Sequence, residues 1–215
     1  NLETVTLAFD EFRGMAQDEA PFAEEISRLY GTRQHTRIFT HGEFEADLER
    51  FFGAMDQPTI DGFNTYFVSK AAREIGLKVA LCGLGGDELF GGYPSFQVIP
   101  RWVQALATPS RIPFLGEAFR RLYSPLKRFS SLHPKGAGIL KYGGTYAGAY
   151  FLKRGLFLPW ELSEFLSTEL VREGLSGLRL LERIQQTIEP DPKNGFARVA
   201  TLEASFYMRN QLLRD

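Results

Sequence analysis

At its centre the chain reads Lys78-Val-Ala-Leu-Cys-Gly-Leu-Gly-Gly-Asp-Glu-Leu-Phe-Gly-Gly-Tyr93. The first five residues of this stretch are nearly all apolar, which predicts a short strand, 78–82, buried on both faces of a sheet. Glycines follow at positions 83, 85 and 86, where they allow a backbone to approach a ligand closely or to adopt a positive φ. Because an open parallel sheet binds its ligands beyond the carboxyl ends of its strands, this glycine-rich turn is a candidate binding site.

Two carboxylates, Asp87 and Glu88, follow the glycines directly. Consecutive backbone amides in such a turn can hold an anion such as phosphate. Acidic side chains beside a phosphate make physical sense if a cation lies between them, and Mg²⁺ prefers a few carboxylates together with phosphate oxygens. The alternative is a connection whose acids only cap the next helix. The second glycine pair, Gly91-Gly92, favours the ligand site over that alternative.

The residues before the turn follow strand and helix patterns in alternation. Apolar side chains recur at every second position at Val5, Leu7 and Phe9, which predicts a strand. The further expected elements are a helix over 18–30 ended by Gly31, a strand over 35–39, a helix over 44–55 with Phe44, Phe51 and Phe52 in the core, and a helix from about Asn64 to Ile75. This order is typical of an α/β fold with a parallel sheet and crossover helices.

After Pro100 the sequence changes character. Prolines separate short helical patterns and no further strand is indicated, so we expect a mainly helical region. The charge changes as well, because residues 1–61 hold 13 acidic and 5 basic side chains, whereas residues 101–141 hold 8 basic side chains and one acid. We therefore divide the chain into an α/β part, 1–100, and a mainly helical extension, 101–215.

The composition is that of a soluble globular protein, with 44% hydrophobic and 24% charged residues among 215. A net charge of −1 argues against a protein built to coat nucleic acid or an anionic membrane. No apolar run approaches the roughly 18 residues of a membrane helix. Cys82 is the single cysteine, which excludes an internal disulfide and a multi-cysteine metal site and fits a reducing, cytoplasmic compartment.

Residues 79–93 as a whole resemble the signature of the synthetase domain of glutamine-dependent asparagine synthetases and their relatives. Further stretches resemble the same family in the same order: Thr4–Phe9, Gly31–His35, Asp56–Asp61 and Tyr207–Asp215. The resemblance is weakest between about 100 and 140. It implies a parallel sheet of the ATP-pyrophosphatase (adenine nucleotide alpha hydrolase-like) type, whose first strand and Ser-Gly-Gly-x-Asp-Ser pyrophosphate loop would lie upstream of Asn1.

For function, the resemblance implies an ATP-dependent, amide-forming carbon–nitrogen ligase. Such an enzyme activates a carboxylate by adenylation, releases pyrophosphate, and uses ammonia from a glutaminase domain to displace AMP. The implied cofactors are ATP and Mg²⁺. The implied partners are aspartate or an analogous small carboxylate, ammonia, and in some cases a second copy of the chain, but neither nucleic acid nor a membrane. This chain by itself, with half of the phosphate site elsewhere, is expected to be inactive.

The resemblance also assigns site residues position by position. Leu7 lies where the adenine is held, Cys82 and Gly83 lie at the nucleotide contact with Gly85 and Gly86 in the same loop, Asp87 lies at the Mg²⁺–pyrophosphate site, and Asp87 and Glu88 are the expected catalytic residues.

Leu84 departs from the family pattern, in which a glutamate lies beside the acceptor carboxylate and the arriving ammonia. A leucine cannot act as an acid or a base. Cys82 replaces a serine and keeps its size, at the cost of a weaker hydrogen bond. Aspartate is the leading acceptor from the family resemblance, but because of Leu84 an amidotransferase acting on another acceptor stays open, as does a non-catalytic scaffold of the same fold. An RNA-modifying relative is a further alternative, against which the balanced charge argues.

Overall fold

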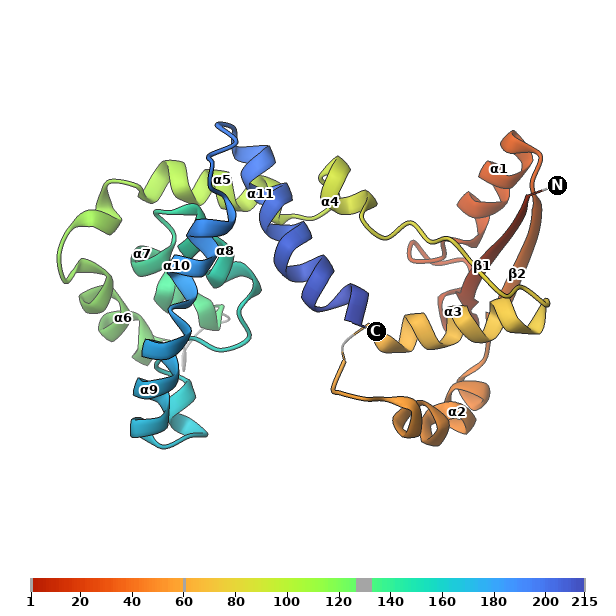
Figure 1. Cartoon of the computed structure of the whole chain (residues 1–215), viewed down its shortest axis with the longest axis horizontal. Coiled ribbons are helices and arrows are strands. Elements are labelled where there is room, and N and C mark those ends of the chain that lie inside the picture. Colours follow the sequence, from red (N-terminus) through yellow and green to blue (C-terminus); the bar gives the residue numbers. More distant parts are fainter. Residues whose placement is uncertain (1, 60, 127–132, 215) are drawn as a thin grey trace. The chain divides into compact units, whose positions relative to one another are not determined.

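The computed structural model describes residues 2–59, 61–126 and 133–214. The chain forms two compact units, the first made of Asn1–Gly83 with Gln211–Asp215 and the second of Leu84–Asn210. Figure 1 shows the helices and strands of both units. Within the described ranges, no helix has the length and apolar character needed to cross a membrane.

The first unit is built on a two-stranded parallel sheet. β1 (Glu3–Phe9) pairs with β2 (Arg33–Phe39) over the full length of both strands, with Glu3 opposite Arg33 and Phe9 opposite Phe39. The short turn η1 (Asp10–Phe12) and the helix α1 (Ala20–Tyr30) connect the two strands. The predicted α/β character and the parallel pairing of the first two strands are therefore confirmed.

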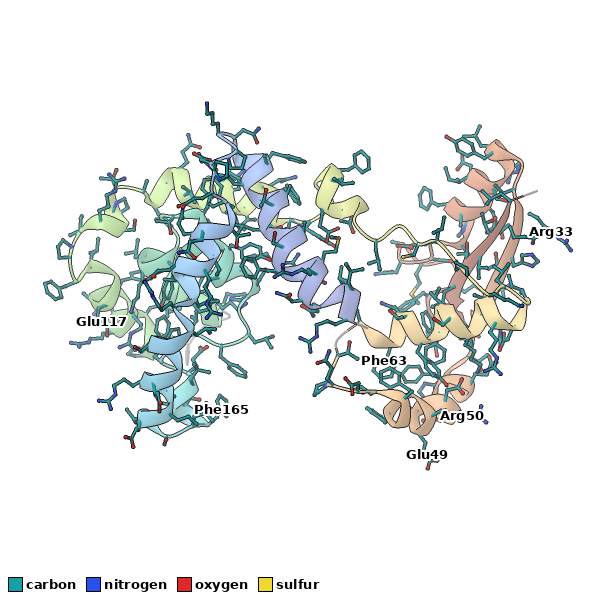
Figure 2. The ribbon with its side chains drawn as sticks, viewed as in Figure 1. Arg33, Glu49, Arg50, Phe63, Glu117 and Phe165 are labelled. Atoms are coloured by element: carbon teal, nitrogen blue, oxygen red, sulfur yellow. The ribbon has the colours of Figure 1, made fainter. Side chains whose placement is uncertain are left out.

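Two further helices, α2 (His41–Ala54) and α3 (Gly62–Glu74), complete the core of the first unit. Phe39, Phe67 and Ala71 are buried at its centre, and apolar side chains of β1, α2 and α3 pack against them. Figure 2 shows Phe63 extending from α3 toward α2, where its ring stacks on that of Phe51 with 3.9 Å between centroids. The carboxyl-terminal turn η6 (Leu212–Arg214) belongs to the same unit.

The predicted third strand is wrong. Residues 78–82 form no strand, and the side chains of Val79 and Leu81 are 80% and 98% exposed. A buried strand needs hydrogen-bonding neighbours for its backbone, and in the described part of the chain β1 and β2 pair with each other alone. Phe52 was also expected in the core and is 59% exposed, because it lies about 100° around α2 from the buried Phe51.

α2 begins with a capping box that also carries an ion pair. The Thr40 hydroxyl accepts a hydrogen bond from the Glu43 amide at 3.3 Å, and the Glu43 carboxylate accepts one from the Thr40 amide at 3.2 Å. Arg37 donates to the same carboxylate. The hydrogen bond from Arg37, with that from the Thr40 amide, holds the pKa of Glu43 below its ordinary value.

We expect Glu43→Gln to lower the free energy of unfolding at pH 7 by about 0.2–1 kcal/mol, the range of solvent-screened pairs. Because the folded-state pKa is depressed, this contribution is present above the ordinary pKa of 4.5 and is lost as the pH falls through the folded-state value. Urea unfolding of both proteins between pH 7 and pH 3 measures it. Glu49→Gln is the control, since Glu49 projects from α2 into solvent (Figure 2). A Glu43→Gln effect that is independent of pH would contradict the ion-pair assignment.

All regular elements of the second unit within the described residues are helical. In order they are α4 (Gly86–Phe90), α5 (Ser95–Leu106), η2 (Pro109–Arg111), α6 (Leu115–Leu126), η3 (Pro134–Gly138), α7 (Ile139–Tyr142), α8 (Tyr146–Arg154), η4 (Leu162–Glu164), α9 (Thr168–Leu178), α10 (Leu180–Thr187), α11 (Gly195–Leu202) and the π-helical η5 (Glu203–Met208). The mainly helical character expected after Pro100 is confirmed, and α5 runs through Pro100 itself.

α8 lies at the centre of the second unit. Its residues 147–152 are all buried. They pack in one core with Ile99 of α5, Ile184 of α10 and Val199 and Leu202 of α11. α8 therefore provides a rigid support for the polar side chains at its carboxyl end. One of these, Arg154, contacts Tyr93 of the glycine-rich turn.

Candidate functional site

The glycine-rich turn, residues 83–93, contains the short helix α4 (Figure 1). Gly85 precedes α4 with a φ of 94° and Gly91 ends it with a φ of 78°, both in the left-handed region that glycine occupies without strain. The amides of Gly91 and Gly92 both donate to the carbonyl oxygen of Asp87, at 2.9 and 3.0 Å. The two left-handed glycines and these hydrogen bonds fix the backbone that carries Asp87.

Asp87 and Glu88 face different surroundings, since consecutive helix residues lie about 100° apart. Asp87 is exposed, and its carboxylate lies so close to Gly92 that a methyl group at position 92 would overlap Asp87 Oδ1. Glu88 is 2% exposed, and its Oε1 accepts a hydrogen bond from Tyr93 Oη at 3.0 Å. Glu88 Oε2 is buried without a hydrogen-bond partner in the described part of the chain. Of the two acids, Asp87 is the one that presents its carboxylate to solvent.

Tyr93 connects the turn to the helices behind it. Burial and then the hydrogen bond to Glu88 raise the pKa of the Tyr93 phenol well above its usual value, so the hydroxyl stays a neutral donor. The Tyr93 ring meets the Tyr207 ring edge to face, with 5.5 Å between centroids. The Arg154 guanidinium lies 3.7 Å from the Tyr207 centroid and 4.9 Å from the Tyr93 centroid.

Glu203, the first residue of η5, completes this cluster and is fully buried. Arg154 Nη2 lies 2.9 Å from Glu203 Oε2, the Ser95 hydroxyl donates to Oε1, and Tyr150 Oη lies 3.4 Å from Oε2. Arg154 and Glu203 were not predicted as site residues, because a contact between residues 49 positions apart leaves no local pattern in the sequence. One signal was present, since Glu203 is the single acid between residues 195 and 208, and an acid within a buried helix indicates a paired charge.

The sequence model of the asparagine synthase family matches residues 1–214. The chain belongs to the asparagine synthase family. A protein assigned as glutamine-hydrolysing asparagine synthetase 2 in Methanocaldococcus jannaschii is 38% identical over 78 residues, which is 35% of this chain and 15% of that protein. Glutamine-hydrolysing asparagine synthetase 1 of Bacillus subtilis is 32% identical over 95 residues, 43% of this chain and 14% of the relative. The matches thus span about one seventh of these relatives, and no solved structure matches significantly.

In this member of the family, the site residues expected from the resemblance fall in both units. α4 and the residue before it bring four of them together in the second unit: Gly85, Gly86, Asp87 and Glu88. Cys82 and Gly83 are exposed and end the first unit. Leu7 is half-buried in β1 and packs against the aromatic core of the first unit.

Two other family-related positions lie near open space. Leu84, which stands where the family carries a glutamate, is 47% exposed. In the first unit, the loop formed by the family-like stretch 56–61 borders a pocket of about 290 Å³, with Asp56, Thr59 and Arg214 among the lining residues. Residue 60 of this loop lies outside the described residues. The pocket makes this loop a candidate for contact with a small ligand of the first unit.

Proposed function

We propose that the protein is an ATP- and glutamine-dependent ligase of the asparagine synthase type. In the proposed reaction a carboxylate attacks the α-phosphate of ATP, pyrophosphate leaves, and ammonia supplied by a glutaminase domain displaces AMP to form an amide. Family membership over residues 1–214 supports this proposal, as do relatives named glutamine-hydrolysing asparagine synthetase. The observation that carries it is the glycine-bracketed turn that presents the Asp87 carboxylate to solvent.

The proposed architecture is a sheet of the ATP-pyrophosphatase type, with 1–100 in the α/β part and 101–215 in a helical extension of the same synthetase domain. The parallel pairing of β1 and β2 supports it. Ligands of such sheets lie beyond the carboxyl ends of the strands. We place Leu7 of β1 at the adenine and Cys82 and Gly83 at the nucleotide, where exposed backbone is available for contact.

ATP and Mg²⁺ are the proposed cofactors. The ranges that the structure describes hold no group of three or more His, Cys, Asp or Glu side chains suited to a metal ion. A magnesium ion that arrives with a nucleotide needs few protein ligands, because phosphate oxygens and water supply the others. The exposed Asp87 carboxylate fits that role, and Mg²⁺ bound there would neutralise charge on the departing pyrophosphate.

The two acids of the turn are proposed to serve catalysis in different ways. Asp87 presents a carboxylate to the metal and the phosphates. Glu88 is buried and acts through Tyr93, because its carboxylate accepts a hydrogen bond from the Tyr93 hydroxyl. Gly85 and Gly86 carry no side chain, so phosphate groups can approach the backbone in front of α4.

Leu84 favours a second candidate within the same family, an amidotransferase whose acceptor is not aspartate. Its half-exposed apolar side chain stands where the family places a glutamate. It can contact an apolar part of an acceptor, but it can neither take up nor release a proton. In both cases we propose a cytoplasmic reaction on a small carboxylate, without a nucleic-acid or membrane partner.

The test is an ATP–pyrophosphate exchange screen of the complete protein against aspartate and a panel of other carboxylates, with an acceptor-free reaction as the blank. Exchange with aspartate supports the leading proposal, and exchange with another carboxylate alone supports the second candidate. Folded protein that exchanges with no carboxylate and binds no ATP would instead indicate a non-catalytic scaffold. Glutamine-dependent amide formation with the active acceptor then identifies the nitrogen source.

Gly92→Ala is expected to lower this exchange by about 10-fold or more, since misplacing a catalytic group by about 1 Å can cost up to about 10²-fold. The added methyl group overlaps Asp87 Oδ1 and forces the carboxylate to move, while φ at position 92 is not in the left-handed region. Gly177→Ala is the matched control, because a methyl group there meets open space on α9. Equal exchange rates in the two variants would contradict the role of the Asp87–Gly92 contact.

A further inference from the structure

The buried ion pair behind the turn is the strongest unexplained feature of the second unit. Glu203 has no exposed surface, and its carboxylate receives hydrogen bonds from Ser95 at the start of α5 and from Arg154 at the end of α8. A charge is rarely buried unless it is paired, and a buried pair often contributes less stability than apolar side chains of the same volume. The location of this pair therefore calls for an explanation other than stability.

Arg154 links Glu203 to the turn. Its Nε lies 2.9 Å and its Nη2 2.9 Å from Glu203 Oε2, while its guanidinium carbon lies 3.7 Å from the Tyr207 ring centroid and 4.9 Å from that of Tyr93. Arginine can do both at once, because its planar guanidinium donates several hydrogen bonds in one plane and stacks on aromatic faces. A lysine ammonium, as a point charge, cannot reproduce this arrangement.

Tyr93 is thereby held at two places. Its ring contacts Arg154 and Tyr207, and its hydroxyl donates to Glu88. Glu88 and Tyr93 bracket the end of α4 and the Gly91-Gly92 pair, whose amides bond the carbonyl of Asp87. Anything that fixes Tyr93 and Glu88 therefore fixes the backbone and the carboxylate of Asp87.

The π-helical segment η5 supplies two members of the cluster, Glu203 and Tyr207. π-helical turns are rare and occur frequently at functional sites. Here a carboxylate and a tyrosine ring four residues apart contact the same guanidinium.

We propose that Arg154 and Glu203 are positioning residues that hold the glycine-rich turn, and with it Asp87, in the geometry that the ligase reaction needs. This proposal rests on the proposed function. The chain of contacts runs from Glu203 to Arg154, from Arg154 to the Tyr93 ring, and from the Tyr93 hydroxyl to Glu88 on α4.

The test uses the complete protein and the double variant Arg154→Met/Glu203→Leu, which replaces the ion pair by apolar side chains and avoids a stranded buried charge. We expect it to fold, but to lose about 10–100-fold in ATP–pyrophosphate exchange, as for outer-shell partners of a metal site. The Mg²⁺ concentration for half-maximal exchange should rise. Arg154→Lys should fail to restore either quantity.

The matched control is Asp191→Asn/Arg198→Met in the same unit. Arg198 also pairs with a carboxylate, that of Asp191 at 2.6 Å, and its guanidinium also lies over a tyrosine ring, that of Tyr146. Because Asp191 and Tyr146 lie outside residues 83–93, this control should keep the wild-type exchange rate and Mg²⁺ dependence. A folded Arg154→Met/Glu203→Leu protein with wild-type values of both would overturn the proposal.

A second readout separates this proposal from the proposed function. Fluorine NMR of 3-fluorotyrosine at position 93 reports the ring environment whether or not the protein is active. The Tyr93 signal should shift and narrow in the double variant as the ring is released, and an unchanged signal would overturn the positioning role. Wild-type protein without exchange on any carboxylate would instead reject the proposed function, and the NMR result would still decide whether the cluster holds the turn.

Discussion

Replacing Asp87 with alanine is expected to lower ATP–pyrophosphate exchange in the complete protein by at least about 10²-fold, the size of effect seen when one preorganised electrostatic group is removed from an active site. Asp87 is exposed, stands in the first turn of α4, and is held by a backbone that Gly85 and Gly91 fix in left-handed conformations. Removing its carboxylate removes the proposed Mg²⁺ ligand but leaves the contacts of the buried core intact, so the free energy of unfolding should stay within about 0.5 kcal/mol.

Two further variants make this result specific. Asp87→Asn keeps the shape and removes the charge, and should lose nearly as much exchange as the alanine variant, because a neutral amide is a poor magnesium ligand. Glu169→Ala removes another exposed acid from the first turn of a helix in the same unit, α9, and should leave exchange unchanged. Exchange by Asp87→Ala within about twofold of wild type, in an active protein, would reject the metal assignment.

Arg154→Met is expected to lower the free energy of unfolding of the second unit by about 3–5 kcal/mol, because it leaves Glu203 charged and fully buried. Glu203→Gln should cost less, about 1–3 kcal/mol, since it leaves behind an arginine whose side chain is 25% exposed to solvent. Combining Arg154→Met with Glu203→Leu should recover most of the loss, and this non-additivity is the mark of a buried pair.

Urea unfolding followed by tryptophan fluorescence measures these values, because both tryptophans, Trp102 and Trp160, lie in the second unit. The control is Glu182→Gln, which breaks an exposed pair with Arg179 and should change stability by less than about 1 kcal/mol. If Arg154→Met and Glu182→Gln cost the same, Glu203 does not behave as a buried charge.

Local sequence signals predicted the parts of the fold that depend on local causes. The alternation in β1 and the helical spacing of apolar side chains in α2 are set by nearby residues, and both elements are present. Of the three glycines for which a positive φ was predicted, Gly85 has one. These features need no knowledge of what lies elsewhere in the chain.

Features that depend on residues distant in the sequence could not be predicted. The apolar composition of 78–82 favours a strand. A strand also needs a neighbouring strand for its backbone hydrogen bonds, and the composition of one segment does not predict that neighbour. The ion pair of Arg154 and Glu203 was not predicted for the same reason, because it forms only where two helices meet in space. The different environments of Asp87 and Glu88 were not predicted either, because the hydroxyl that binds Glu88 belongs to Tyr93, five residues further along the chain.

The exposed segment 78–82 has a practical consequence for handling the protein. It is extended, lacks regular structure, and begins with an exposed lysine at the junction in sequence between the two compact units. Proteases cut such segments in preference to helices and paired strands, because the backbone can enter their active sites without unfolding. Brief trypsin treatment should therefore cleave after Lys78 before it cleaves within α8, and intact-mass spectrometry of the first fragments would identify the first cut.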